Sequence, residues 1–262
     1  CSSAHGSRIA PEGVHARSTR SCAMGASGAH AEPVDRRQYH ARHHFECLAR
    51  GRQLLAQIQT DLSAATTLLS ELPSGVTVFG SARTAPDDAA YQCAWRLGSW
   101  LGRAGLPVLT GGGPGIMEAV NRGAREADGI SVGLNIELPY EQTPNPHLTH
   151  QLHFHHFSTR KLMLTRYSRG FVIFPGGFGT TDELLELLVA FHTDRGARYP
   201  MVLVDSAFWS GLLTWFTEQL GSRQLIDLHN TDFIEVVDDE KAALDVLLGA
   251  EATADLMRRY AE

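Results

Sequence analysis

The sequence predicts an α/β fold: a Rossmann-like, doubly wound parallel sheet in a three-layer α/β/α arrangement, forming a single domain with an N-terminal helical extension. Short apolar runs alternate with longer segments of helical periodicity, which is typical of a parallel sheet covered on both faces. Two of these runs end in glycine-rich turns that lead into helices, within 109–118 and 171–183. The 262 residues suffice for one domain that buries about 70–75% of its unfolded surface.

Two segments precede the sheet. Residues 1–34 are rich in Ser, Ala, Gly, His and Arg without an apolar period, which predicts a disordered tail, and Met24 is a candidate native start. Residues 35–73 are predicted to form the N-terminal helix, because apolar residues recur mostly at helical spacing before Pro73-Ser74-Gly75 ends the helix. Residues 74–262 are left for the Rossmann-like domain.

This domain is predicted to alternate strands and helices throughout. Strands are expected at 76–79, 107–109, 130–136, 152–157, 171–174, 201–204 and 233–237, where short runs are apolar. Helices are expected at 87–104, 116–127, 158–169, 181–192, 208–220 and 240–260. Residues 138–146 contain three prolines and are expected to form a loop. In such sheets ligands bind at the carboxyl ends of the strands, where both glycine turns lie.

The composition narrows the partners and the compartment. A formal net charge of −6 argues against nucleic acid or an anionic membrane as the main partner. Four cysteines are scattered without a C-x-x-C pair, which fits a reducing cytoplasm. No apolar run approaches the ~20 residues of a membrane span, and residues 1–34 lack the apolar core of a secretory signal. We therefore expect a cytoplasmic protein that binds neither nucleic acid nor membranes.

The first glycine turn is Gly111-Gly112-Gly113-Pro114-Gly115. It matches neither the G-x-G-x-x-G order of a dinucleotide site nor the G-K-[ST] of a P-loop. Its backbone N–H groups could converge on an anion at a helix N-terminus. Alternatively, the glycines only allow a tight junction, with Pro114 setting the first helical φ. Two such turns at one sheet edge favour phosphate and ribose binding.

The second turn is Pro175-Gly176-Gly177-Phe178-Gly179-Thr180, followed by Thr181-Asp182-Glu183. Glu183 supplies an acid where a phosphorylated ligand would sit. However, Thr180 and Glu183 also have the T-x-x-E spacing of a capping box, so Glu183 could simply bond the backbone of the helix start. Glu186, one turn further, is either a ribose ligand or a solvated carboxylate.

Two other groups of charged or titratable side chains stand out. Arg160 and Lys161 begin a predicted helix, where positive charge opposes the helix dipole. A bound phosphate or a surface ion pair would compensate. His153, His155 and His156 lack the further ligands of a tetrahedral metal site, so we interpret them as ordinary polar histidines and expect no metal.

These motifs resemble the LONELY GUY (LOG) family, whose members have often been labelled lysine decarboxylases. The family motif P-G-G-x-G-T-x-x-E is intact at 175–183, the upstream R-K pair matches Arg160-Lys161, and the resemblance covers about 74–240. It implies that 74–262 is a nucleotide-binding catalytic domain with Glu183 and Arg160 as the catalytic pair. The implied substrate-binding residues are Gly80, Ser81, Gly112, Gly113, Gly115, Met117, Glu118, Lys161, Pro175, Gly176, Gly177, Gly179, Thr180 and Glu186.

The implied activity is hydrolysis of the N-glycosidic bond of a nucleoside 5′-monophosphate, AMP or an N6-substituted AMP, to free base and ribose 5-phosphate. No cofactor is required, and a homodimer or higher homo-oligomer is expected. Pro114 departs from the plant-type turn and resembles bacterial branches, some of which hydrolyse general purine or pyrimidine monophosphates. The alternative is a non-catalytic nucleotide or molybdenum-cofactor carrier on the same fold. The intact Glu183 and Arg160 favour the enzyme.

Overall fold

A computed structural model describes residues 36–138, 143–192, 199–227 and 233–260, with side chains from residue 50 onward. By internal contacts the chain divides into Cys1–Cys47 and Leu48–Glu262. The predicted tail at 1–34 lies outside the described residues. The division into tail, helix and domain stays a prediction.

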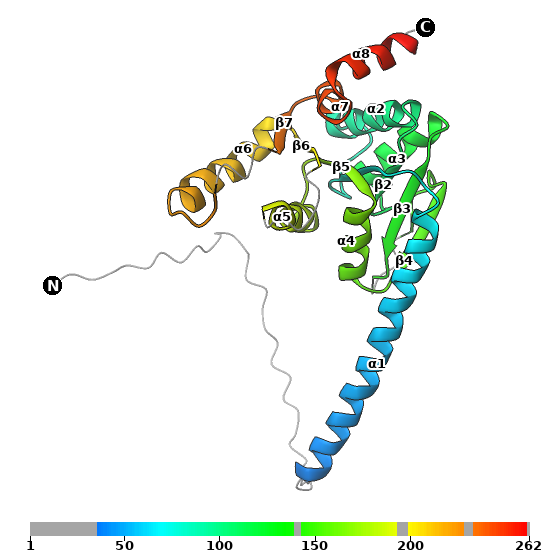
Figure 1. Ribbon diagram of the computed structural model, residues 1–262, viewed down its shortest axis with the longest axis vertical. Helices are drawn as coiled ribbons and strands as arrows, with labels where there is room; N and C mark the ends of the chain where they lie inside the picture. The colour runs from blue at the N-terminus through cyan, green and yellow to red at the C-terminus, as the bar shows by residue number, and fades with distance from the viewer. Residues whose placement is uncertain (1–35, 139–142, 193–198, 228–232, 261–262) are drawn as a thin grey trace, which may run out of the picture. The chain divides into compact units, whose positions relative to one another are not determined.

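The Rossmann-like prediction is confirmed by a seven-stranded sheet of order β4-β3-β2-β1-β5-β6-β7 (Figure 1). All of its strand pairs are parallel. The strands are β1 (Gly75–Phe79), β2 (Val108–Thr110), β3 (Ser131–Ile136), β4 (His150–Phe154), β5 (Ser168–Ile173), β6 (Met201–Val204) and β7 (Ile234–Val237). The order reverses between β1 and β5, and such switch points are where open α/β sheets bind ligands.

Helices cover both faces of this sheet. The described helices are α1 (Arg36–Leu69), α2 (Ala89–Arg103), α3 (Ile116–Glu126), α4 (Phe157–Arg166), α5 (Phe178–His192), α6 (Ser206–Trp215), α7 (Glu240–Leu248) and α8 (Ala250–Arg259), with a π-helical turn at Phe216–Gly221. One core cluster joins α2, α3 and α7 to the sheet, and the other joins the end of α1 with α4, α5 and α6. Along β5, Val172 packs into the first cluster and Phe171 and Ile173 into the second. This alternation produces the three predicted layers.

Local chemistry sets several of the boundaries. Asp88, Asp205 and Asp239 each accept a hydrogen bond from a backbone N–H in the first turn of α2, α6 and α7, which is the usual role of an N-cap aspartate. In the core, the hydroxyls of Thr77 and Ser168 lie 2.5 Å apart and both reach the carbonyl of Leu164. These buried polar groups are therefore satisfied at the end of α4.

Several predicted boundaries were wrong. The helix expected at 240–260 is two helices, because Gly249 adopts φ +89° between α7 and α8. The strand expected to reach residue 157 ends at Phe154, and α4 ends at Arg166 so that β5 begins at Ser168. Helix α6 ends at Trp215 and gives way to the π-helical turn. Helix α5 starts at Phe178, three residues earlier than expected, which changes the role of Glu183.

Candidate active site

A cavity of about 780 Å³ lies at the switch point between β1 and β5. Its lining includes the loop after β1, the starts of α4 and α5, and single residues of α3 and β3. The loop after β1 contacts the loop after β5, because the N–H of Ser81 donates to the carbonyl of Pro175 at 3.0 Å. A volume of this size falls within the range of small-molecule sites.

The second glycine turn opens into this cavity. Gly176, Gly177, Gly179 and Thr180 line it. In the described part of the chain, the backbone N–H groups of 178–180 have no protein partner, while the N–H of Thr181 donates to the carbonyl of Gly177 at 3.0 Å. A Cβ at Gly177 or Gly179 would meet no protein atom within 4 Å. The turn therefore offers unpaired donors and room for an anion at the N-terminus of α5.

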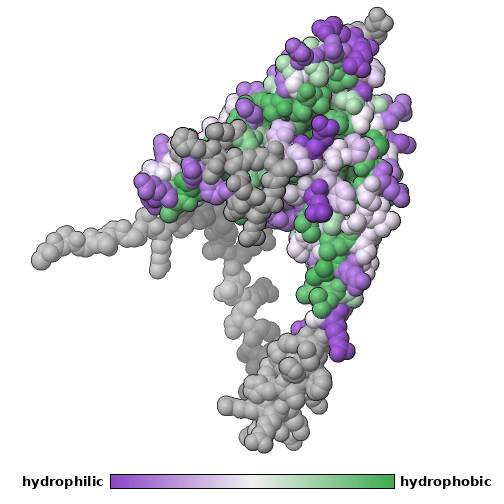
Figure 2. Space-filling view, in the orientation of Figure 1, coloured by the Kyte–Doolittle hydropathy of each residue, from purple (hydrophilic) through white to green (hydrophobic). Residues whose placement is uncertain are grey.

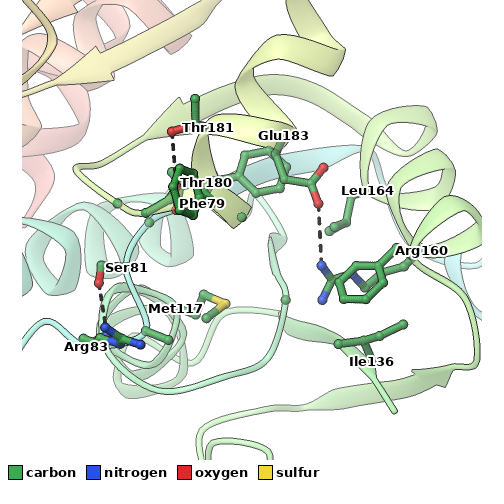
Figure 3. Close-up of a pocket in the computed structure, with 18 of the residues that line it drawn as sticks. Phe79, Ser81, Arg83, Met117, Ile136, Arg160, Leu164, Thr180, Thr181 and Glu183 are labelled. Carbon is green, nitrogen blue, oxygen red and sulfur yellow. Dashed lines mark hydrogen bonds and ion pairs between the residues drawn. The ribbon is translucent and has the colours of Figure 1, made fainter. Parts of the chain in front are cut away.

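Glu183 and Arg160 face each other across the cavity wall (Figure 3). Their Oε1 and Nη2 atoms are 3.6 Å apart, and their side chains are only 8% and 14% exposed. Burial raises the pKa of Glu183 from 4.5 to about 7, although the charges of Arg160 and Lys161 oppose this shift. A carboxyl with such a pKa in a cavity is suited to proton transfer near neutral pH.

Arg160 is held only loosely by protein groups. Burial lowers its pKa, although Glu183 opposes this shift, and a guanidinium remains charged at neutral pH. Its Cζ lies 5.1 Å from the centre of the Phe157 ring. Its Nε atom is buried and, among the described residues, has no hydrogen-bond partner. Buried donors are normally satisfied, so Arg160 keeps an unpaired donor behind the cavity wall that the described protein groups do not use.

The capping-box interpretation of Glu183 is wrong. Helix α5 begins at Phe178, so Glu183 lies inside the helix rather than at its third position. Its side chain pairs with Arg160 instead of the backbone at the start of the helix. Phe178 itself is 96% exposed at the cavity.

Lys161 and Glu186 lie beside the cavity rather than among its described lining residues. The Nζ of Lys161 contacts Asp182 at 2.7 Å and Glu186 at 2.8 Å. The positive charge in the first turn of α4 is therefore compensated by an ion pair with α5, which is one of the two expected alternatives.

The first glycine turn is directed into the protein. The N–H of Gly112 donates to Thr110, and its carbonyl accepts from the N–H of Asn145. The amide of Asn145 also bonds the carbonyl of Gly113 and the side chain of Asn121. Gly111 and Met117 line the cavity, whereas Gly112, Gly113, Gly115, Glu118 and Pro175 are not among its described lining residues.

Several lining residues were not among the predicted site residues. They are Phe79, Ala82, Arg83, Gly111, Ile136, Leu138, Phe157, Leu164, Phe178 and Thr181. Arg83 could have been found, because it follows the predicted strand at the same sheet edge. The apolar residues carry no sequence signal that separates them from the core.

The three histidines stand apart from this chemistry. His155 pairs with Asp61, with Nδ1 and Oδ1 2.6 Å apart. Within the described residues no group of three or more His, Cys, Asp or Glu side chains could hold a metal ion. In the same part of the chain, no helix combines the length and apolar character needed to cross a membrane.

The chain is similar in sequence to several known proteins. A family model described as "possible lysine decarboxylase" matches residues 117–247, half of the chain. The pyrimidine/purine nucleotide 5′-monophosphate nucleosidase of Escherichia coli K12 is 33% identical over 128 residues, which cover 46% of this chain but 28% of that protein. The cytokinin riboside 5′-monophosphate phosphoribohydrolase of Rhodococcoides fascians is 28% identical over 149 residues, covering 55% of this chain and 74% of that protein.

The fold has a counterpart among solved structures. The molybdenum cofactor carrier protein of Chlamydomonas reinhardtii superposes with a TM-score of 0.50 and 23% identity, over 71% of this chain and 99% of that chain. At this identity the likeness concerns the fold alone. Together, the family match and the intact 175–183 motif show that this chain belongs to the family described as possible lysine decarboxylases, the LOG family.

Proposed function

We propose that this protein hydrolyses the N-glycosidic bond of a nucleoside 5′-monophosphate, AMP or an N6-substituted AMP, to free base and ribose 5-phosphate. The observation that carries the proposal is the Arg160–Glu183 pair in the wall of a cavity that also receives the open N-terminus of α5. The names of the E. coli and R. fascians relatives support the same reaction class.

The phosphate is assigned to the second glycine turn. The unpaired N–H groups of 178–180 and the dipole of α5 favour a bound anion there. Anchoring the phosphate fixes the position of the ribose relative to Glu183, which lies on the same helix. The aromatic and aliphatic lining, including Phe79, Phe157 and Ile136, offers an apolar surface to the base.

Glu183 carries the chemistry in this proposal. Cleavage of an N-glycosidic bond develops positive charge on the sugar, which a nearby carboxylate stabilises. The same carboxylate takes a proton from the attacking water, whose hydroxide forms the new bond to the sugar; the bonding electrons leave with the base, which receives the proton that Glu183 has taken up. Arg160 keeps part of Glu183 ionised near neutral pH and places a positive charge in the cavity wall, where it attracts the anionic substrate.

A carrier without turnover is the alternative. Such a protein would need neither a carboxyl with a pKa near neutrality nor an arginine beside it. The likeness to the molybdenum cofactor carrier protein does not favour it, since that likeness is one of fold.

We also propose a homo-oligomeric, cytoplasmic protein. Helices α4 and α5 leave Phe157, Leu162 and Leu185 about half exposed, and apolar patches lie between the polar ones on the face in Figure 2. Such patches are common at subunit interfaces. Among the described side chains the cysteine, Cys93, is buried and free, which suits a reducing compartment.

The test is incubation of the purified protein with AMP, an N6-substituted AMP, GMP, CMP and UMP, followed by chromatographic detection of free base. Adenosine is the matched control for the phosphate. A charge-assisted hydrogen bond contributes about 1.5–3 kcal/mol, so kcat/KM on adenosine should be lower by several decades. Equal rates on AMP and adenosine would contradict the placement of the phosphate.

A further inference from the structure

Helix α4, which carries Arg160, lacks a cap from its own sequence. Its N-cap residue is His156, whose side chain makes no capping hydrogen bond. Arg160 and Lys161 add two positive charges to the first turns, where the helix dipole is also positive. Something outside the helix must hold this end in place.

Asp61 of α1 supplies that anchor across 94 residues of sequence. Its carboxylate accepts hydrogen bonds from the backbone N–H of His155 at 3.1 Å and from the hydroxyl of Thr159 at 2.7 Å. Its Oδ1 lies 2.6 Å from Nδ1 of His155, and its side chain is 0% exposed. Both partners flank the N-cap of α4.

The carboxylate is ionised where it lies. Burial acts to raise the pKa of Asp61, but the hydrogen bonds from Thr159 and His155 outweigh burial and hold the pKa below its usual value. A buried negative charge therefore faces the positive end of α4, and Thr159 is the residue directly before Arg160.

We propose that Asp61 is a positioning residue: by bonding His155 and Thr159 it fixes the turn of α4 that presents Arg160 to Glu183 and to the cavity. Its bearing on catalysis rests on the proposed function; its bearing on the Arg160–Glu183 distance does not. The competing interpretation is that Asp61 only stabilises the contact between α1 and α4.

Asp61→Asn separates these interpretations. An amide of the same shape has one acceptor oxygen instead of two and no charge, so at least one of the three donors loses its partner. If the turn then loosens, Arg160 moves away from Glu183. Of the other charged groups around Glu183, Asp182 and Glu186 lie on α5, and Lys161, although it lies on α4, is held to α5 by its two ion pairs.

The primary readout is the titration of the Glu183 carboxyl, followed by carbon-13 NMR in the protein without substrate. An opposite charge within about 4–6 Å lowers a carboxyl pKa by about 1–3 units, so retreat of Arg160 should raise the midpoint by about one pH unit. Direct loss of the Asp61 charge would lower the midpoint instead. The sign therefore distinguishes positioning from a simple charge effect.

Two further variants make the result specific. In an Arg160→Ala background, Asp61→Asn should no longer raise the midpoint, because the shift acts through Arg160. Leu69→Ala, also on α1 but buried in the core, should lower the melting temperature without moving the midpoint. If Asp61→Asn does not fold, Thr159→Val removes one donor, keeps the charge, and should shift the midpoint in the same direction.

Turnover provides the second readout. Displacement of a catalytic group by about 1 Å can reduce rates by about 100-fold, so Asp61→Asn should lower kcat/KM on AMP by about 10–100-fold. An unmoved or lowered midpoint in folded Asp61→Asn would overturn the proposal. A raised midpoint in a protein that cleaves no nucleotide would instead reject the proposed function and keep the positioning role.

Discussion

The two glycine turns have similar sequences and lie at the same sheet edge, yet they differ in what their backbone groups bond. In the turn at 111–115, the N–H and carbonyl of Gly112 are bonded within the protein. In the turn at 175–180, the N–H groups of 178–180 are unpaired in the described part of the chain. A glycine-rich sequence thus predicts a turn, and only the partners of the backbone groups decide whether the turn can bind a ligand.

The glycines differ in the same way. A Cβ at Gly112 would lie 2.5 Å from the side chain of Asn135, and its φ is +70°, so the first turn needs glycine for its own packing. In the second turn, Gly176 is likewise packed, against Thr180, whereas Gly177 and Gly179 have open space around them, so packing does not require glycine at these two positions. We infer that the second turn binds the phosphate and the first turn supports the sheet edge.

Glu183→Gln should have the largest effect. Gln cannot take a proton from water or supply negative charge, and loss of a general base reduces rates by about 10²–10⁴-fold. The variant should remain folded by circular dichroism and still bind AMP in calorimetry. Glu118→Gln, in the first turn of α3, is the matched change at the other glycine turn and should lose far less activity. Near-normal turnover by Glu183→Gln would contradict the proposed role of Glu183 as the general base.

Stability should depend on pH through Glu183. Its pKa is raised from 4.5 to about 7 by burial, so the folded state binds more protons than the unfolded state between these pH values. The free energy of unfolding should therefore fall as the pH rises through this window, by about 3 kcal/mol. Denaturant titrations of wild type and Glu183→Gln, compared at each pH, isolate this contribution. Parallel curves of unfolding free energy against pH for the two proteins would show that folding does not raise the pKa of Glu183.

Alanine substitutions should separate the two turns. Gly179→Ala should leave the melting temperature nearly unchanged, because its Cβ meets no protein atom, but it should weaken AMP binding by narrowing the phosphate site. Gly112→Ala should cost about 1–3 kcal/mol of stability, because alanine is strained at positive φ. Thermal unfolding and calorimetric titration of both variants test this contrast. Similar changes in melting temperature and AMP affinity in both variants would contradict the assignment of different roles to the two turns.

Lys161→Met should have the smallest effect. The side chain of Lys161 is largely buried, but its partners Asp182 and Glu186 are largely exposed. Removal of the amine therefore leaves both carboxylates in contact with water, and the loss should be about 1 kcal/mol. Burial acts to lower the pKa of Lys161, but these carboxylates raise it above its usual value, so the amine is unsuited to a Schiff base. We expect no lysine decarboxylation and no absorbance band of bound pyridoxal phosphate. Such a band in wild type that Lys161→Met abolishes would contradict this.

The parallel sheet and the second glycine turn could be predicted from the sequence alone. Alternating apolar runs predicted parallel strands, and a motif contained in nine consecutive residues placed Glu183 on the helix that follows β5. The packing of the first turn could not be predicted, because its partner Asn145 lies 32 residues after Gly113 and carries no motif. The same holds for Asp61, which contacts Thr159 of α4 across 98 residues. The break at Gly249 was missed because a single glycine interrupts an otherwise helical pattern.

Ser81 couples the two turns through its backbone. Its N–H donates to Pro175, and its carbonyl accepts from the N–H of Ile116 at the start of α3. Because Ser81 is hydrogen-bonded to both turns, it can shift only together with Pro175 and Ile116. This wall of the cavity is therefore rigid and fixes the position of a bound ligand. Under the proposed function, a larger or differently shaped base is then accommodated where Phe157 and Leu164 of α4 line the cavity. Changes of base preference should therefore arise by substitutions on α4, while the glycine turns stay the same.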